Sequence, residues 1–155
     1  MTKLTVSREI QASPEQFFAF VTSERMNEVW GEWMKGKWDS EGPVGVGTKG
    51  HFDTKGTLAS FGRLNGEVVE FEENKKMTMH TKDAKGKMDT TDSLIFEPTA
   101  TGTKATYITD YKVPYSVFGK LIDKVKISRD MEYMHVRMLE NLKNVLEQRP
   151  VVSSA

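Results

Sequence analysis

The most constraining feature of the chain is a strand that leads directly into a capped helix near the N-terminus. The segment Thr5–Ile10 is predicted as a short strand. Beyond it, Ser13 can accept a hydrogen bond from a free backbone N–H of a first helical turn, proline suits the first helical position, and Gln16 completes a capping box. The sequence therefore predicts a helix over Pro14–Val21, and a second short helix over Glu24–Val29.

Strand signals dominate the middle of the chain. Polar or glycine-bearing turns, such as Asp83–Gly86 and Thr99–Gly102, separate them. Strands joined by such short turns favour one antiparallel sheet. After the helix pair, the predicted strands are Glu32–Trp38, Thr48–Lys55, Phe61–Phe71, Lys75–Thr81, Met88–Phe96 and Lys104–Lys112.

The C-terminal region predicts a long helix with one apolar stripe, which suits a helix that lies across a sheet. A change of register at Lys126–Asp130 predicts a kink or break there, and Pro150 is predicted to end the helix. We therefore expect a single domain over residues 1–149 and a disordered tail over residues 150–155. The stripe consists of Met131, Met134, Met138, Leu142 and Val145, widened by Leu139 and Leu146.

The order of these features resembles the START-like superfamily, also called helix-grip or SRPBCC, and within it the polyketide cyclase/dehydrase and lipid-transport group. The segment Ala12–Val21, the following Trp30 and the glycine turn Gly42–Thr48 carry the resemblance, which spans about Thr5–Gln148. It implies an α+β helix-grip fold, in which a seven-stranded curved antiparallel sheet surrounds a long C-terminal helix. Two short helices follow the first strand, in the order β-α-α-β6-α. The resemblance also implies a hydrophobic cavity between sheet and helix, with the glycine turn at its mouth.

Aromatic and methionine side chains on the inner sides of these elements are the candidate ligand-binding residues. Methionine adapts to irregular space, which suits a pocket and a filled core equally well. A typical ligand site would have a volume of about 300–1,000 Å³. The candidates are Trp30, Phe52, Phe61, Met77, Met79, Met88, Tyr107, Phe118, Tyr133, Met134 and Met138.

Polar residues interrupt the apolar register of one strand. Thr90 and Asp92 share the side of Met88, Leu94 and Phe96. One interpretation is a bulge or a solvated end of the sheet, and the other is a polar group that faces a cavity. A carboxylate enclosed by apolar side chains would have a raised pKa and could act as a general acid or base. We assign no catalytic residue; the weak candidates are Asp92, Asp110, His51 and His80.

The sequence lacks the patterns of several kinds of site. The chain has three histidines, at no short metal-binding spacing, and no cysteine. No nucleophile elbow is present, and the glycine turn leads into a strand instead of the helix that a phosphate-binding loop requires. We expect no metal and no cofactor.

The composition of the chain limits the kinds of molecule that it is expected to bind. The 22 basic and 22 acidic side chains give a net charge of zero, so no overall field attracts nucleic acid. The longest apolar run, Phe17–Val21, is too short for membrane insertion, and the first residues lack the apolar core of a signal peptide. We expect a cytoplasmic protein, monomeric or homodimeric, whose partner is a hydrophobic small molecule.

Three functions fit the resemblance. The leading hypothesis is binding or carriage of a hydrophobic or amphipathic small molecule in the internal cavity. The second is a polyketide cyclase/dehydrase-like enzyme that uses acid and base residues in that cavity. The third is an interaction module like the Hsp90 activator, with a vestigial cavity.

Overall fold

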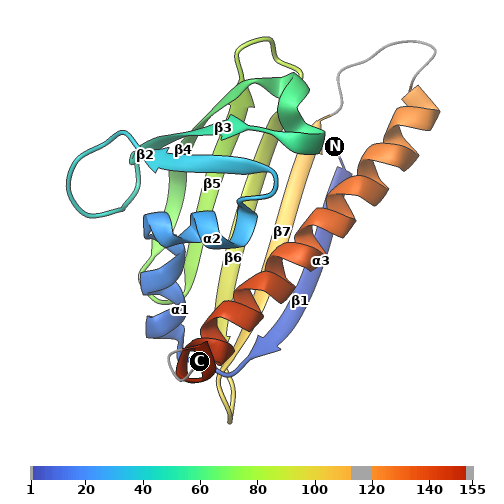
Figure 1. Cartoon of the computed structure of the whole chain (residues 1–155). Helices are drawn as coiled ribbons and strands as arrows, with labels where there is room; N and C mark the ends of the chain where they lie inside the picture. The colour runs from blue at the N-terminus through green and yellow to red at the C-terminus, as the bar shows by residue number, and fades with distance from the viewer. Residues whose placement is uncertain (1, 113–119, 153–155) are drawn as a thin grey trace.

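The computed structural model describes residues 2–112 and 120–152, which form one seven-stranded sheet with helices packed on one of its faces (Figure 1). The helix α3 lies across this face, and α1 and α2 cover it beside α3. The elements in chain order are β1 (Thr2–Ile10), α1 (Pro14–Val21), the 3-10 helix η1 (Glu24–Met26), α2 (Asn27–Trp30), β2 (Met34–Trp38), β3 (Lys49–Thr54), the 3-10 helix η2 (Gly56–Phe61), β4 (Arg63–Glu72), β5 (Lys76–Asp83), β6 (Asp89–Pro98), β7 (Thr103–Lys112) and α3 (Lys120–Val152).

The strand order is β1-β7-β6-β5-β4-β3-β2, and every neighbouring pair is antiparallel. The strands from β2 to β7 follow one another through the sheet, as short turns require. The first strand pairs with the last one, from Thr2 opposite Tyr111 to Ile10 opposite Thr103. The predicted helix-grip architecture, with its seven antiparallel strands, two short helical segments after β1 and a C-terminal helix, is confirmed.

The predicted cap of α1 is present. The Ser13 side chain accepts a hydrogen bond from the Gln16 backbone N–H at 3.2 Å, and the Gln16 side chain accepts one from the Ser13 N–H at 2.9 Å. This capping box fixes the start of the helix, so that Phe17 and Phe18 point into the core. Their rings lie 5.0 and 5.9 Å from the ring of Phe96 on β6.

The sheet bends at a bulge in β4. The register between β4 and β5 shifts between Val68 and Glu70, so that Val69 has no cross-strand partner. An unpaired residue of this kind bends its strand and increases the local twist. Val69 is 40% exposed, whereas its neighbour Val68 is fully buried. The bulge therefore keeps the inner side chains in the core while it helps to curve the sheet around α3.

The second half of α3 is part of the core. Leu139, Leu142 and Leu146 are buried among β1, α1 and β6 side chains in one cluster. The predicted kink or break at Lys126–Asp130 is wrong, because the helix is continuous from Lys120 to Val152 (Figure 1). The prediction that Pro150 ends the helix is also wrong. A proline deprives a helix of one backbone donor and can be accommodated by a kink instead of a stop.

We expect Leu142→Ala to lower the free energy of unfolding by about 2–5 kcal/mol, because it leaves a cavity in the core. Leu142 is 2% exposed. Urea unfolding followed by circular dichroism measures the change. The matched control is Val46→Ala, whose side chain is 70% exposed and which should alter stability by less than about 0.5 kcal/mol. Equal effects of the two substitutions would contradict the placement of α3 in the core.

Candidate functional site

A cavity of about 430 Å³ lies between the inner face of the sheet, the segment from η1 to β2 and residues 130–135 of α3. Its wall is mostly apolar. The side chains come from nearly every element, among them Trp33 directly before β2, Trp38 at the end of β2, Leu58 on η2, Leu64 on β4 and Leu94 on β6. Such a volume lies within the range of small-molecule sites.

The candidate ligand-binding residues gather around this cavity. Met138 is an exception: it is 4% exposed and belongs to the core cluster, because it lies one helical turn beyond the end of the cavity. Phe118 lies outside the described residues. The others line the cavity, and their role in binding stays a prediction: Trp30, Phe52, Phe61, Met77, Met79, Met88, Tyr107, Tyr133 and Met134.

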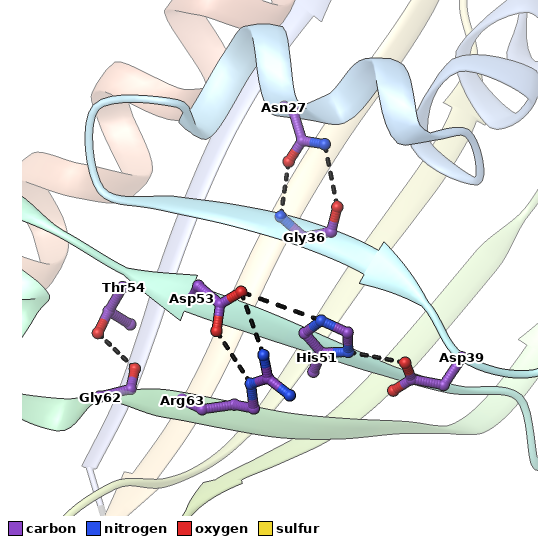
Figure 2. A network of polar contacts seen from close by, with 8 residues as sticks. All are labelled: Asn27, Gly36, Asp39, His51, Asp53, Thr54, Gly62 and Arg63. Atoms are coloured by element: carbon purple, nitrogen blue, oxygen red, sulfur yellow. Dashed lines mark hydrogen bonds and ion pairs between the residues drawn. The ribbon is translucent and has the colours of Figure 1, made fainter.

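The side chain of Asn27 fixes one wall of the cavity. Its amide accepts a hydrogen bond from the backbone N–H of Gly36 at 2.7 Å and donates one to the Gly36 carbonyl at 3.0 Å (Figure 2). The same amide oxygen accepts a hydrogen bond from the Trp30 indole N–H at 2.8 Å. Trp30 is thereby held edge-on to Phe52, with ring centroids 5.3 Å apart. A Cβ on Gly36 would collide with the Phe52 ring, so this close approach requires glycine.

Asp92 brings a carboxylate to the apolar wall. It lines the cavity from β6, and the ladders to β5 and β7 run through it without a shift, so the interpretation as a bulge is wrong. Thr109, directly opposite on β7, donates a hydrogen bond to Asp92 Oδ1 at 2.6 Å. Thr90 donates one to Oδ2 at 3.0 Å. The polar residues on the inner register are thus paired with one another.

Burial is the main influence on the charges of this cluster. It raises the pKa of Asp92, and hydrogen bonds from Thr109, Thr90 and Tyr107 oppose that rise. The pKa of Tyr107 is raised well above its ordinary value by burial and by the nearby Asp92 charge, so the phenol keeps its proton. A carboxylate with a raised pKa is a stronger base than an exposed one.

His135 on α3 completes the cluster. Its ring lies over the Tyr107 ring with centroids 4.4 Å apart, and its Nε2 is 3.1 Å from Thr109 Oγ1. The residue is 4% exposed and lines the cavity. Burial lowers its pKa from 6.5 to about 4, so the imidazole is neutral near pH 7.

The remaining acid and base candidates lie on the opposite face of the sheet. Successive side chains of a strand alternate between faces. Asp110 lies between Thr109 and the cavity-lining Tyr111, and His80 lies between Met79 and Thr81, which also line the cavity. His80 pairs with Asp89 at 2.7 Å.

His51, next to Phe52, belongs to a surface network. Its Nδ1 lies 2.7 Å from Asp39, and its Nε2 lies 4.0 Å from Asp53 (Figure 2). Arg63 donates to Asp53 at 2.9 Å in the same network. These exposed contacts connect β3 to β4 and to the end of β2. Of the four acid or base candidates predicted from the sequence, all of which the structure describes, Asp92 alone lines the cavity.

Charged groups of both signs surround the cavity at exposed positions. They are Glu24, Glu32, Lys37, Lys87, Lys112 and Asp130. An ion pair of 3.2 Å between Arg137 on α3 and Glu32 links the helix to the segment after α2.

The glycine turn Gly42–Thr48 does not line the cavity, contrary to the expectation from the resemblance. The Gly47 N–H donates to the Val68 carbonyl at 2.8 Å, and Val44 packs on the core. Gly42 and Gly47 have positive φ angles, which turn the chain at this end. The loop between β2 and β3 therefore supports the region of α1 and β4.

Within residues 2–112 and 120–152 no group of three or more histidine, aspartate or glutamate side chains is arranged to hold a metal ion. In the same residues, no helix is long and apolar enough to cross a bilayer.

Two members of the polar cluster were not identified from the sequence, although signals for both exist. His135 interrupts the apolar stripe of α3, four residues after Met131 and four before Leu139, so it had to face the sheet. The position of Thr109 could be inferred from the predicted turn at Thr99–Gly102. Pairing the residues of the two flanking strands outward from that turn places Thr109 opposite Asp92.

Comparison with known proteins identifies the family. Residues 1–147 match the family described as polyketide cyclase / dehydrase and lipid transport, and the chain belongs to this family. No functionally curated protein matches the chain.

Solved structures share the fold at low sequence identity. The protein TTHA0849 of Thermus thermophilus has a TM-score of 0.75 and 16% identity, with 99% of this chain and 100% of that chain covered. The protein MLL2253 of Mesorhizobium loti has a TM-score of 0.70 and 20% identity, with coverages of 95% and 98%. Aha1 of Colwellia psychrerythraea, solved in solution as a dimer, has a TM-score of 0.67 and 18% identity, with coverages of 95% and 97%.

We expect His135→Phe to weaken the pH dependence of stability. Between pH 4 and 6.5 the unfolded chain binds a proton at this histidine more readily than the folded protein does. The contribution of neutral His135 is therefore complete above pH 6.5 and is lost as the pH falls through about 4. From pH 6.5 to pH 4, the wild type should lose about 3 kcal/mol more unfolding free energy than the variant.

Urea unfolding at a series of pH values measures this difference. Both proteins carry the same carboxylates, so comparing them isolates the contribution of His135. The control is Val46→Ala, which alters an exposed side chain without a titratable group and should keep the slope of the wild type. Parallel curves for His135→Phe and the wild type would show that His135 is not buried in its neutral form.

Proposed function

We propose that the protein binds an uncharged or amphipathic hydrophobic small molecule in the cavity beneath α3, as a carrier or binding protein. The observation that carries the proposal is the cavity of about 430 Å³ with its mostly apolar wall. Burial of apolar ligand surface in such a wall contributes about 25 cal/mol per Å² before the costs of association. The family description, with its mention of lipid transport, supports the same ligand class.

The flexible wall supports binding of ligands with different shapes. Met77 and Met79 lie on β5, Met88 lies directly before the neighbouring strand β6, and Met134 lies on α3. Methionine side chains adopt many rotamers and present a polarizable sulfur, so they can repack around a ligand. A cytoplasmic location remains an expectation of this proposal, which subcellular fractionation with a tagged chain would test.

We expect Met134→Ala to weaken binding of the neutral fluorophore Nile red about fivefold, because a contact with the ligand is lost. Its unfolding free energy should change by less than about 1 kcal/mol, because the side chain is partly exposed. Leu142→Ala, which truncates the core away from the cavity, is the matched control. At a temperature where it stays folded, it should keep the affinity within about twofold.

Fluorescence titration with each variant measures the affinities. If Leu142→Ala weakened binding and Met134→Ala did not, the ligand would lie elsewhere in the molecule. If the wild type failed to bind Nile red or any neutral amphiphile, the proposal would be wrong, and the interaction-module hypothesis would gain support.

One observation favours a second candidate, an enzyme that transfers protons within the cavity. Asp92 reaches the cavity and is linked through Thr109 to His135, which is the arrangement that an acid–base mechanism needs. The simplest reaction of this class is removal of a proton from the carbon next to a ketone. The carboxylate takes the proton, the electron pair moves to the carbonyl oxygen, and a solvent proton later returns to carbon.

Deuterium exchange of 2-tetralone in D₂O, followed by NMR, separates the two candidates. A binding protein should give no exchange above that of buffer. An enzyme of this class should accelerate the exchange, and Asp92→Asn should remove the acceleration while Nile red still binds. The control Asp110→Asn removes a carboxylate from the opposite face, whose charge is the smallest of the influences on the pKa of Asp92, and should keep most of the acceleration.

A further inference from the structure

The carboxylate of Asp92 is partly open to the cavity. Its side chain lies on the inner face of β6, on which Thr90 and Leu94 also line the cavity. Both edges of β6 are covered by β5 and β7, yet Asp92 stays partly exposed. The exposed part of the residue therefore faces the cavity, where a ligand can reach it.

This carboxylate has hydroxyl partners and no cation. Thr109, Thr90 and Tyr107 donate hydrogen bonds to it, and no positive charge contributes to its pKa, which burial raises. His135 is neutral near pH 7, and the lysines that line the cavity are at exposed positions. A charge removed from water is normally paired with an opposite charge. Among the described residues, nothing supplies that charge to Asp92.

The hydrogen bonds of Asp92 leave room for one more donor. A carboxylate has about four lone-pair positions. Thr109 donates to Oδ1 at 2.6 Å, Thr90 donates to Oδ2 at 3.0 Å, and Tyr107 takes a third position. Both threonines are buried, so they hold the carboxylate in place before a ligand arrives. The remaining position fits an N–H group from the cavity.

We propose that the cavity is selective for hydrophobic amines in their protonated form, whose ammonium group donates a hydrogen bond to Asp92 while the hydrocarbon part lies along the apolar wall. The inference rests on the proposed function and deepens it by naming the ligand class. Hydrogen bonds between two charged groups are stronger than neutral ones. The fold has already removed most of the hydration of Asp92, so binding has to desolvate only the ammonium.

The surroundings of Asp92 suit a cation with an apolar chain. Met79 lies directly opposite on β5, and Tyr107 lies two residues before Thr109 on β7; both line the cavity. The face of an aromatic ring attracts a cation, and methionine packs against a chain. A carboxylate ligand would instead meet the like charge of Asp92. The exposed charged residues that line the cavity are three acidic and three basic ones, so they favour neither sign.

Competition with Nile red at pH 7 tests the selectivity. The probes are decylammonium, decan-1-ol and decanoate, which share one alkyl chain, each below its micelle-forming concentration. The wild type should bind decylammonium about tenfold more tightly than decan-1-ol, the value of one hydrogen bond to a charged group, and decanoate more weakly than both. Asp92→Asn keeps the size of the side chain and removes its charge, and should bring ammonium and alcohol within about twofold of each other.

Two matched variants remove a carboxylate elsewhere. Asp130→Asn alters an exposed residue of α3 that lines the cavity, and Asp110→Asn alters the opposite face of the sheet. Both should keep most of the preference for the ammonium. Loss of the preference in Asp130→Asn but not in Asp92→Asn would place the ammonium at the exposed edge of the cavity and overturn the inference. Equal affinity of the wild type for ammonium and alcohol would also overturn it, while Nile red binding upheld the proposed function.

NMR of the ¹³C-labelled wild type tests the same contact without a substitution in the site. A cation beside Asp92 lowers the pKa that burial raises. Saturating decylammonium should therefore move the titration midpoint of the Asp92 carboxyl signal down by about one pH unit, which corresponds to a tenfold preference, whereas decan-1-ol should not lower it. The other titratable groups near Asp92 are Tyr107 and Asp110 on β7 and His135 on α3.

A midpoint that decylammonium leaves unchanged would overturn the inference. Absence of binding by Nile red and by all three probes would overturn the proposed function and the inference together.

Discussion

The antiparallel pairing of β1 with β7 is the contact on which the rest of the structure depends. It joins the first and last strands along their whole length, from Thr2 and Tyr111 to Ile10 and Thr103. Because α3 follows β7, this pairing brings the helix across β1 and the inner face of the sheet (Figure 1). The leucines of its second half then pack in the core with α1, while residues 130–135 line the cavity. Core and cavity are thus two parts of one interface, separated at about Met138.

The inner face of the sheet carries two kinds of chemistry. Around Phe96 it is covered by aromatic rings from α1. Around Asp92 it carries hydroxyl groups and a carboxylate that hydrogen-bond to one another, and in the described part of the chain His135 Nδ1 is the one buried side-chain nitrogen or oxygen without a partner. Buried polar groups are costly unless they are paired, which is why the hydroxyl groups and the carboxylate lie within hydrogen-bonding distance of one another.

The sequence predicted the helices and strands better than the contacts between side chains of different elements. Alternation and turn residues located every strand within a few residues, and Ser13 and Gln16 located α1, because these signals are local. The prediction from Pro150 was wrong because a helix can continue past a proline with the loss of one backbone hydrogen bond. The glycine turn was placed at the cavity by resemblance, whereas its position depends on the contact between Gly47 and Val68. The cluster of Asp92, Thr109 and His135 combines three elements, so no local pattern contained it.

The contact between Asn27 and Gly36 has a consequence for solubility. β2 is an edge strand of the open sheet, and the outward N–H and C=O groups of an edge strand can pair with a strand of another molecule. At Gly36, the centre of β2, both groups are already bonded to one side-chain amide, which imitates the pairing of a neighbouring strand (Figure 2). A second molecule would have to displace Asn27, and with it the support of Trp30, before the two sheets could join. The residue that shapes the cavity wall therefore also occupies the backbone groups at the centre of this edge, which a strand of another molecule would need.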